Sequence, residues 1–467
     1  MENKVKYLMK NTGILAIGSF SSKFLIFLLV PLYTSVLTTS EYGTFDLIST
    51  TIQFLMPIIT ANIYEGVTRF LMDYSKPKDE VISIGIKFIS IGIFVFGVLV
   101  FVNWKFYIWE PLAKYSLLTF VFFTVTLLNS FMVQFAKGME AVKYVAIAGI
   151  MGTIVTVICN VYFLLGLSLG LKGFFLAYTW GQIVPVIYYF FVLRIHKYIT
   201  FNIDKNLEKE MLLYSIPLVI NTLGWWINNV SDRYVVTFIC GVAANGIYSV
   251  SYKIPSILNV IQGIFTQSWQ ISAVKEYDND KSKNFFGDTI QTINILVCSA
   301  CMILILVSKI LARILFIKDF YSAWKYVPFL LVSITINAAS GVLGPILCAK
   351  KNSKAMATSA IYGAIVNIIL NFILIYFIGI QGAAIATAIS SLVIYCCRRK
   401  AVGRDIALTD KNRFIFSWIM IILQSIVMIY MENYVIQLVL IGIFVIVFRK
   451  IFKNYLLTVN KIIFKRK

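Results

Sequence analysis

The sequence predicts an all-α, polytopic membrane protein, and three observations point to this fold class. First, 59% of the 467 residues are hydrophobic and only 13% are charged, with a mean hydropathy of +0.84. Soluble domains carry about 25% charged residues. Second, apolar segments long enough to cross a bilayer recur along the chain. Third, the loops between these segments alternate between many and few basic residues, as in proteins that cross the membrane repeatedly.

About fourteen apolar segments are predicted to be transmembrane helices. Most have 20 or more residues, the length that crosses the hydrocarbon core. Short turns containing glycine, such as Gly379–Gly382, separate neighbouring segments. The first segment is too long for the core of a signal peptide and no small-residue cleavage site follows it, so we expect it to be retained. The predicted spans are 11–37, 43–72, 82–104, 112–136, 144–166, 172–194, 211–240, 245–271, 285–308, 325–348, 355–378, 381–397, 414–431 and 433–449.

The distribution of basic residues predicts the orientation of the chain. The net charge of +21 would suggest nucleic-acid binding in a soluble protein. With the N-terminus placed in the cytoplasm, 30 of the 42 Lys and Arg residues fall in cytoplasmic segments, 7 in outer segments and 5 within spans. This bias satisfies the positive-inside rule and predicts that both termini are cytoplasmic. Topology and lipid headgroups therefore account for the basic charge, and no nucleic acid is expected as a partner.

The chain is also internally repeated. The stretch "NVYFLLGLSLGLKGFFLAYTWG" from Asn160 parallels "NFILIYFIGIQGAAIATAISS" from Asn371, with a two-residue difference in the loop. The copies are offset by six spans, so the two halves have the same orientation, as in transporters whose substrate site lies between parallel repeats. We therefore predict an N-terminal six-helix bundle at 1–205, a C-terminal six-helix bundle at 206–405, and two extra helices with a basic cytoplasmic tail at 406–467.

Five cations fall inside the predicted spans: Lys23, Arg69, Lys87, Arg233 and Lys253. Lys87 lies close to the inner end of its span and can extend to the interface. The other four lie in the first two spans of each half, where a central charge costs about 2.5–3.5 kcal/mol on insertion scales. We therefore interpret these four as substrate-binding residues that line a wet cavity. Arg binds phosphate with two parallel hydrogen bonds and Lys acts as a mobile point charge, so the set favours a phosphate-bearing substrate.

Acidic residues accompany some of these cations. Glu65 lies one helical turn before Arg69, which is the favourable order for an ion pair. Asp232 directly precedes Arg233, although neighbouring side chains on a helix point about 100° apart. Glu65 and Asp232 are therefore candidates either for ion pairs or, when desolvated, for coupling transport to H+ or Na+. The alternative interpretation is that all these charges are paired and only hold helices together.

No catalytic residue, bound cofactor or metal site is predicted. The seven cysteines lie in apolar segments without clustered histidines, so we expect them to be buried small side chains. The sequence has no glycine-rich nucleotide-binding loop. A glycan polymerase or ligase needs catalytic groups in a substantial outer loop, whereas the longest outer connections, near 104–112 and 308–325, are short and basic. We therefore predict a transporter and not an enzyme.

Two stretches resemble a known family. "KNTGILAIGSFSSKFLIFLLVPLYTSVLTTSEYGTFDL" (10–47) is similar to the opening of Wzx-type polysaccharide flippases, which belong to the multidrug/oligosaccharidyl-lipid/polysaccharide exporter superfamily. "NNVSDRYVVTFICGVAANGIYSVSYKI" (228–254) resembles the matching stretch in the second half of these proteins. Asp232, Arg233 and Lys253 occupy motif positions in this stretch. Lys23, Glu65 and Arg69 are candidates from the local sequence alone.

The resemblance implies a flippase of the bacterial cytoplasmic (inner) membrane. Such proteins move undecaprenyl-pyrophosphate-linked oligosaccharide repeat units, of O-antigen, capsule or a similar glycan, to the outer leaflet by alternating access. The resemblance also implies a central cavity lined chiefly by spans 1, 2, 7 and 8, which are the spans that carry the four cations. The expected partners are the lipid-linked oligosaccharide, membrane lipids, and the glycan polymerase and chain-length machinery. Two alternatives stay open: a lipid II flippase of peptidoglycan synthesis, and a cation-coupled multidrug exporter, whose site should be acidic and aromatic.

Overall fold

The fold is described from a computed structural model, which covers residues 25–260, 262–263, 266, 269, 282–350, 352–403 and 410–464. Within these residues the chain is helical, with turns and short connections between helices and no β-strand. The predicted all-α fold class is confirmed. Lys23, most of the first predicted span and the end of the basic tail lie outside the described residues.

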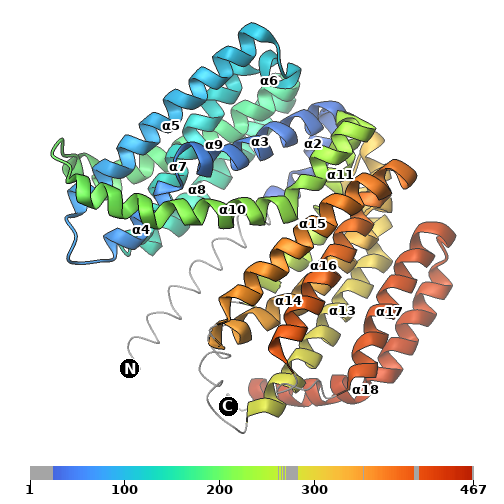
Figure 1. The fold of residues 1–467 in the computed structure, drawn as a ribbon. Coiled ribbons are helices and arrows are strands. Elements are labelled where there is room, and N and C mark those ends of the chain that lie inside the picture. The colour runs from blue at the N-terminus through green and yellow to red at the C-terminus, as the bar shows by residue number, and fades with distance from the viewer. Residues whose placement is uncertain are drawn as a thin grey trace. The chain divides into compact units, whose positions relative to one another are not determined.

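The chain forms two compact units, Met1–Val230 (unit 1) and Ser231–Lys467 (unit 2). The boundary falls inside α10 (Lys205–Cys240), the long green helix of Figure 1, whereas the bundles predicted from the sequence meet between residues 205 and 206, at the start of this helix. The first part of α10 belongs to unit 1 because it packs there. Its Trp226 donates from Nε1 to the carbonyl oxygen of Thr50 at 3.0 Å.

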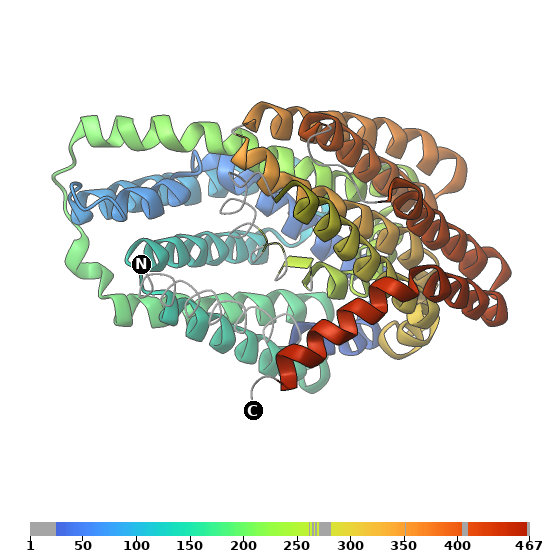
Figure 2. The same ribbon diagram turned by 90° about the horizontal axis from the view of Figure 1, so that it is seen from below.

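Unit 1 is a helical bundle in which one span is broken. The long helices α5, α7, α8 and α9 run beside one another in Figures 1 and 2, where they are coloured blue to green. In chain order the elements of the unit before α10 are α2 (Val30–Val36), α3 (Thr39–Ile59), α4 (Ile63–Leu71), α5 (Lys78–Phe106), α6 (Glu110–Lys114), α7 (Ser116–Gly138), α8 (Val142–Asn160), the π-helix η1 (Val161–Gly166), α9 (Gly170–Leu193) and the 3₁₀ turn η2 (Ile195–Tyr198).

The break lies between α3 and α4, inside the predicted span 43–72. The two helices meet at a bend of 60°. Pro57 lacks the N–H that would continue the helical ladder. Ala61 and Asn62 follow with left-handed φ angles of 50° and 53°, which an α-helix of L-residues does not contain. The chain therefore leaves the break in a new direction, and α4 carries the two predicted site residues of this span.

Unit 2 is arranged around α14, in whose apolar stretch 89% of the residues are buried. After the second part of α10, the elements of unit 2 in chain order are α11 (Val242–Ser251), α13 (Ser282–Leu315), the 3₁₀ segment η3 (Lys318–Lys325), α14 (Val327–Ala349), α15 (Ser353–Ile378), α16 (Ile380–Val402), α17 (Lys411–Ile426), the π-helix η4 (Val427–Met431) and α18 (Tyr434–Phe464).

Ten helices among the described residues are long and apolar enough to span a membrane, or up to eleven if the bent pair α3 and α4 is one span. Each of the ten coincides with one of the predicted spans. The four predicted spans that are absent from these ten are 11–37, 43–72, 211–240 and 245–271. The first and last extend beyond the described residues, the second is the broken pair, and the third is the more polar α10. These are also the four spans that carry the candidate substrate-binding cations.

The internal repeat is visible in the packing of each unit. The helix pairs α5·α7, α7·α8, α7·α9 and α8·α9 are in contact in unit 1, and their counterparts α13·α14, α14·α15, α14·α16 and α15·α16 are in contact in unit 2. The tight turn between the last two helices is repeated as well. A Cβ added at Gly173 would lie 3.0 Å from the carbonyl oxygen of Phe163, and one added at Gly382 would overlap the backbone of Leu374, the residue that corresponds to Phe163.

Polar contacts hold the start of α10 against α5 in unit 1. Lys87 of α5 pairs with Glu208 at 2.7 Å, and Lys76, in the loop before α5, pairs with Glu210 at 2.6 Å. The hydrogen bond to Glu210 raises the pKa of Lys76 above its usual value. Lys87 therefore reaches a polar helix end, as its position near the end of a span predicted.

Buried amides join the two C-terminal helices to α13. Asn294 of α13 donates to the Ser417 hydroxyl at 2.8 Å and accepts from Trp418 Nε1 at 2.8 Å. Gln424 of α17 donates to Gln437 of α18 at 2.8 Å. Amide side chains of this kind need protein partners inside a bilayer because no water is available there. The two extra helices are therefore an attached part of unit 2.

We expect Gly382→Leu to destabilise the protein, because the added side chain must displace the backbone of Leu374 in the turn between α15 and α16. Overpacking of this kind costs on the order of 1–3 kcal/mol or more. Gly442→Leu in α18 is the matched control, because a Cβ there meets nothing within 4 Å. The apparent Tm of detergent-purified protein measures both variants. Equal Tm values for the two variants would contradict the close approach at Gly382.

Candidate functional site

The most enclosed charge among the predicted site residues is Asp232, on α10 in unit 2. Its side chain is 3% exposed. Oδ2 accepts hydrogen bonds from the hydroxyl of Tyr248 at 2.6 Å and from the hydroxyl of Tyr252 at 2.9 Å, while Oδ1 accepts from the backbone N–H of Arg233 at 3.0 Å. Three donors thus take the place of water around a carboxylate buried in the helix bundle. As the helical geometry predicts, the carboxylate serves residues other than the Arg233 side chain.

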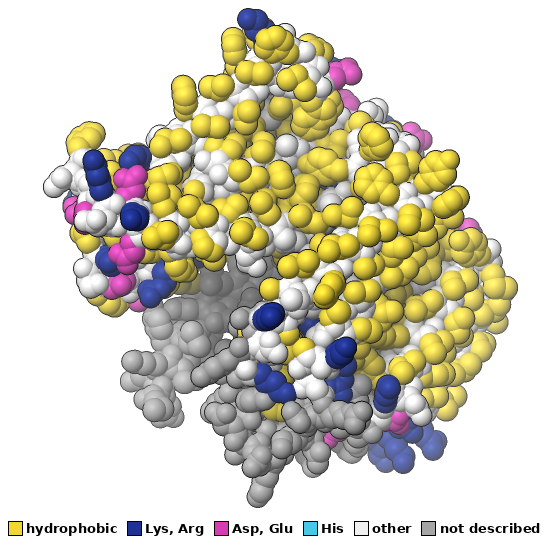
Figure 3. All heavy atoms as spheres, in the orientation of Figure 1, with side chains coloured by type: hydrophobic (Ala, Val, Ile, Leu, Met, Phe, Trp, Pro, Cys, Tyr) yellow, Lys and Arg dark blue, Asp and Glu magenta, His cyan; other side chains and the backbone are white. Residues whose placement is uncertain are grey.

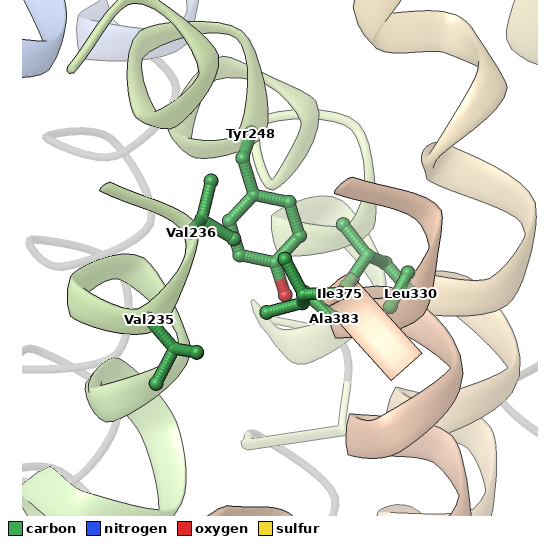
Figure 4. Close-up of a cluster of buried hydrophobic side chains, with 7 residues drawn as sticks. Val235, Val236, Tyr248, Leu330, Ile375 and Ala383 are labelled. Carbon is green, nitrogen blue, oxygen red and sulfur yellow. The ribbon is translucent and has the colours of Figure 1, made fainter. Parts of the chain in front are cut away.

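Tyr248 fixes this arrangement in the core of unit 2. Its ring is fully buried and packs in a cluster with Val235 and Val236 of α10, Leu330 of α14, Ile375 of α15 and Ala383 of α16. Figure 4 labels Tyr248 and these five side chains. The hydroxyl projects from this apolar cluster and reaches Asp232. The carboxylate is therefore held by a side chain that the packing of four helices immobilises.

Arg233 and Tyr252 form the second layer of the cluster. The guanidinium carbon lies 5.6 Å from the centroid of the Tyr252 ring, within the range of a cation–π interaction. The same tyrosine bonds to Asp232 through its hydroxyl, and the Tyr248 and Tyr252 hydroxyls are 3.1 Å apart. Tyr252 therefore touches both the acidic and the basic member of the Asp–Arg motif.

Lys253 lies at an interruption of the eighth predicted span. α11 ends at Ser251, and residues 252–254 form a turn in which the Lys253 N–H donates to the Val250 carbonyl oxygen at 2.9 Å. The side chain is half-buried, and its ammonium group forms no ion pair with any Asp or Glu of the described residues. The structure thus brings Asp232, Arg233 and Lys253 to one region of unit 2, around Tyr252.

In unit 1, Glu65 and Arg69 both lie on α4 but do not pair with each other. Glu65 accepts a hydrogen bond from Gln134 Nε2 of α7 at 2.6 Å, and Thr68 donates to the Gln134 carbonyl oxygen at 3.0 Å. No ion pair joins Glu65 to Arg69 within the part of the chain that the structure describes. The ion pair between Glu65 and Arg69 that the i, i+4 spacing suggested is therefore not formed here. Gln134, from the neighbouring helix α7, bonds to the Glu65 carboxylate instead.

Arg69 is exposed and lies in the last turn of α4. Asp73, just beyond that helix, accepts hydrogen bonds from the Ser75 hydroxyl at 2.7 Å and the Ser75 N–H at 3.1 Å, which lower the pKa of the Asp73 carboxyl. The guanidinium of Arg69 thus stays accessible beside an ionised carboxylate.

Two residues of these clusters were missed by the sequence analysis. Tyr248 is part of the motif "GIYSVSYK" and lies four residues before Tyr252, so the one-turn spacing of two tyrosines was the available signal. Gln134 offered no signal, because its partner Glu65 is 69 residues away in sequence. Among the described residues, no group of three or more His, Cys, Asp or Glu side chains is placed to hold a metal ion.

Comparison with known proteins gives a family match. A family model described as "Polysaccharide biosynthesis protein" matches residues 8–270, which is more than half of the chain. No curated protein matches the chain by sequence.

Solved structures share the fold. The inward closed form of the lipid II flippase MurJ aligns with a TM-score of 0.71 and 18% identity over 94% of this chain and 99% of its own. An inward-facing multidrug resistance MATE transporter of the MOP superfamily aligns with a TM-score of 0.70 and 12% identity over 84% of this chain and 98% of its own. A MOP-superfamily transporter from Pyrococcus furiosus Vc1 (DSM3638), described as having a binding pocket of reverse polarity, aligns with a TM-score of 0.60 and 12% identity over 85% of this chain and 96% of its own. At these identities the likeness establishes the fold alone.

Tyr248→Phe should lower the thermal stability, because it removes one of three donors to a buried carboxylate. Hydrogen bonds to charged groups contribute about 1.5–3 kcal/mol. Tyr376→Phe on α15 is the control, since Tyr376 is 75% exposed. In a double-mutant cycle with Asp232→Asn, measured by apparent Tm or chemical unfolding in detergent, Tyr248→Phe should cost less once the carboxylate is absent. Strictly additive effects would contradict the bond.

Proposed function

The chain belongs to the polysaccharide biosynthesis protein family, and from that premise we propose that it is a flippase for undecaprenyl-pyrophosphate-linked oligosaccharide. The family match connects the chain with polysaccharide biosynthesis, and the fold it shares with solved transporters supports a transport role. The substrate is the finer part of the proposal. It rests on cations that lie in otherwise apolar spans and suit a diphosphate.

The single observation that carries the proposal is that no carboxylate of the described residues balances the positive charge of Lys253. The nearby carboxylate of Asp232 already accepts two tyrosine hydroxyls and a backbone N–H. Lys253 is half-buried at a helix interruption and has no acidic partner among the described residues. A half-buried cation of this kind must be stabilised by a water-filled cavity or by an anionic ligand. A site for cationic drugs would instead require uncompensated carboxylates.

In the proposed cycle the protein breaks no bond. The diphosphate headgroup is neutralised by Arg233 and Lys253 of unit 2, its sugars enter water, and the polyprenyl chain remains in the lipid. Lys23 and Arg69 stay candidate substrate-binding residues from the sequence. Access to the headgroup then changes from the cytoplasmic to the outer side, as in other transporters built from repeats. We place the chain in the bacterial cytoplasmic membrane with both termini inside. The released repeat unit passes to a glycan polymerase and its chain-length machinery.

The substrate is tested with purified protein in proteoliposomes. Translocation of a fluorescent undecaprenyl-pyrophosphate oligosaccharide is measured by its loss of reaction with an impermeant quencher. Movement of lipid II in place of this substrate would identify the rival flippase, and export of cationic dyes with neither lipid moved would identify a drug exporter. Coupling to H+ or Na+ is tested in the same vesicles by imposing a gradient of each ion. A translocation rate that is the same with and without each gradient would exclude the coupling role predicted for Glu65 or Asp232.

Lys253→Ala should reduce translocation at least tenfold, equivalent to about 1.4 kcal/mol of lost substrate stabilisation. Lys253→Arg should retain a larger share of the rate because it keeps the charge. Lys105→Ala at the exposed end of α5 removes the same charge outside the candidate site and should transport like the unaltered protein. The same variants are scored by surface glycan in a strain lacking the gene. Full glycan display by Lys253→Ala at normal expression would defeat the proposal.

A further inference from the structure

A second cation in unit 2 is partly buried between helices and is not used by the proposed transport site. Arg398 lies near the end of α16, and its side chain reaches Ser340 of α14 and Ser359 of α15. Nε donates to the Ser359 hydroxyl at 3.2 Å, and Nη1 donates to the carbonyl oxygen of Ser340 at 3.1 Å. Both serines are fully buried. The guanidinium is therefore held against α14 and α15.

No carboxylate balances this charge within the described part of the chain. The hydrogen bonds of Arg398 go to a hydroxyl and a carbonyl, and none of the ion pairs among these residues includes it. A guanidinium has five N–H donors, of which these bonds use two. The buried hydroxyl of Ser340 also has no hydrogen-bond partner there. A cation and a hydroxyl are thus left with bonding capacity that an anion can fill.

The surrounding sequence is basic throughout. From α14 to the residue after α16, residues 327–403 contain six Lys and Arg residues and no Asp or Glu. Lys350 donates to the carbonyl oxygen of Val402 at 2.6 Å, and Arg399 donates to that of Gly403 at 3.0 Å, so both also cap the end of α16. In Figure 3, which has the orientation of Figure 1, dark blue side chains gather where the orange helices α15 and α16 of Figure 1 have their lower ends, while yellow side chains cover the surface above them. The positive-inside rule predicts that this end is cytoplasmic.

The fold itself does not require an arginine at this position. In the register of the repeat, Arg398 corresponds to Tyr189 in unit 1, and Ser359 corresponds to Ala148. Tyr189 and Ala148 are each 1% exposed, so the equivalent place in unit 1 is closed by ordinary packing. The charge in unit 2 is therefore an addition to the common architecture, and it needs a reason other than helix packing.

We propose that Arg398, with Ser340 and Ser359, forms a phosphate-binding site that takes the headgroup of an anionic phospholipid. The fork of a guanidinium matches two phosphate oxygens, and the Ser340 hydroxyl, which has no other partner among the described residues, supplies a further donor. The Ser359 hydroxyl donates to the carbonyl oxygen of Met356 at 2.8 Å and accepts from Arg398, so its part is to position the guanidinium. Basic pockets between membrane helices at the cytoplasmic side bind the headgroups of anionic lipids. The site uses none of the residues of the proposed transport site, so its test is a binding measurement that does not depend on transport.

The test uses the purified full-length chain in detergent, with phosphatidylglycerol as probe and phosphatidylcholine as the zwitterionic comparison. Phosphatidylglycerol should raise the apparent Tm saturably, and phosphatidylcholine should not. Arg398→Gln should raise the apparent Kd for phosphatidylglycerol at least tenfold, and Ser359→Ala a few-fold. Arg413→Gln is the control. Arg413 is an exposed cation paired with Asp410 at 3.1 Å, and its loss should change the Kd less than twofold.

A parallel titration with inorganic phosphate distinguishes the source of the phosphate. Saturable stabilisation by phosphate alone that Arg398→Gln abolishes would support the site and assign it to a soluble anion. Should Arg398→Gln fail to fold, Ser359→Ala decides with the same measurement, because it keeps the charge and removes only a hydroxyl. The proposal is overturned if the folded variants bind phosphatidylglycerol with the Kd of the unaltered protein, or if phosphatidylcholine stabilises equally.

Discussion

A carboxylate buried among helices must find its hydrogen-bond donors within the protein, and the arrangement of the candidate site in unit 2 follows from this constraint. Asp232 obtains three donors, two of them tyrosine hydroxyls from one turn of the chain around α11. Because Tyr248 is also part of the apolar core that joins α10, α14, α15 and α16, satisfying the carboxylate fixes the segment that carries Lys253. One buried charge thus determines where the neighbouring cations lie.

The sequence predicted most of the helices because long apolar runs have few alternatives to a transmembrane helix. It did not predict the break between α3 and α4. Pro57 suggests a kink, but the bend also needs left-handed backbone at Ala61 and Asn62, two residues that are compatible with a continuous helix. The interruption before Lys253 was missed for the same reason. Hydropathy measures how apolar a segment is and carries little information about the backbone within it.

The charged residues of the site could be found from sequence because each is costly within an apolar span. Their partners could not. Glu65 bonds to Gln134 instead of Arg69, and that choice depends on which face of α7 meets α4. Asp232 bonds to tyrosines instead of pairing with the Arg233 side chain, because adjacent side chains diverge on a helix, while Tyr248 of α11 and Tyr252 just after it approach the carboxylate from the next segment of the chain. Periodicity within one helix identifies neighbours, whereas contacts between helices are set by packing.

The amides that join α13 to the last two helices bear on the order in which the chain is made. Asn294 bonds to Ser417, 123 residues later in the sequence, and Trp418 bonds back to Asn294. Synthesis proceeds from the N-terminus, so α13 enters the membrane long before these partners exist. During that interval its amide has to be sheltered by water, lipid headgroups or the insertion machinery. Maturation of unit 2 is therefore completed only once α17 has been synthesised.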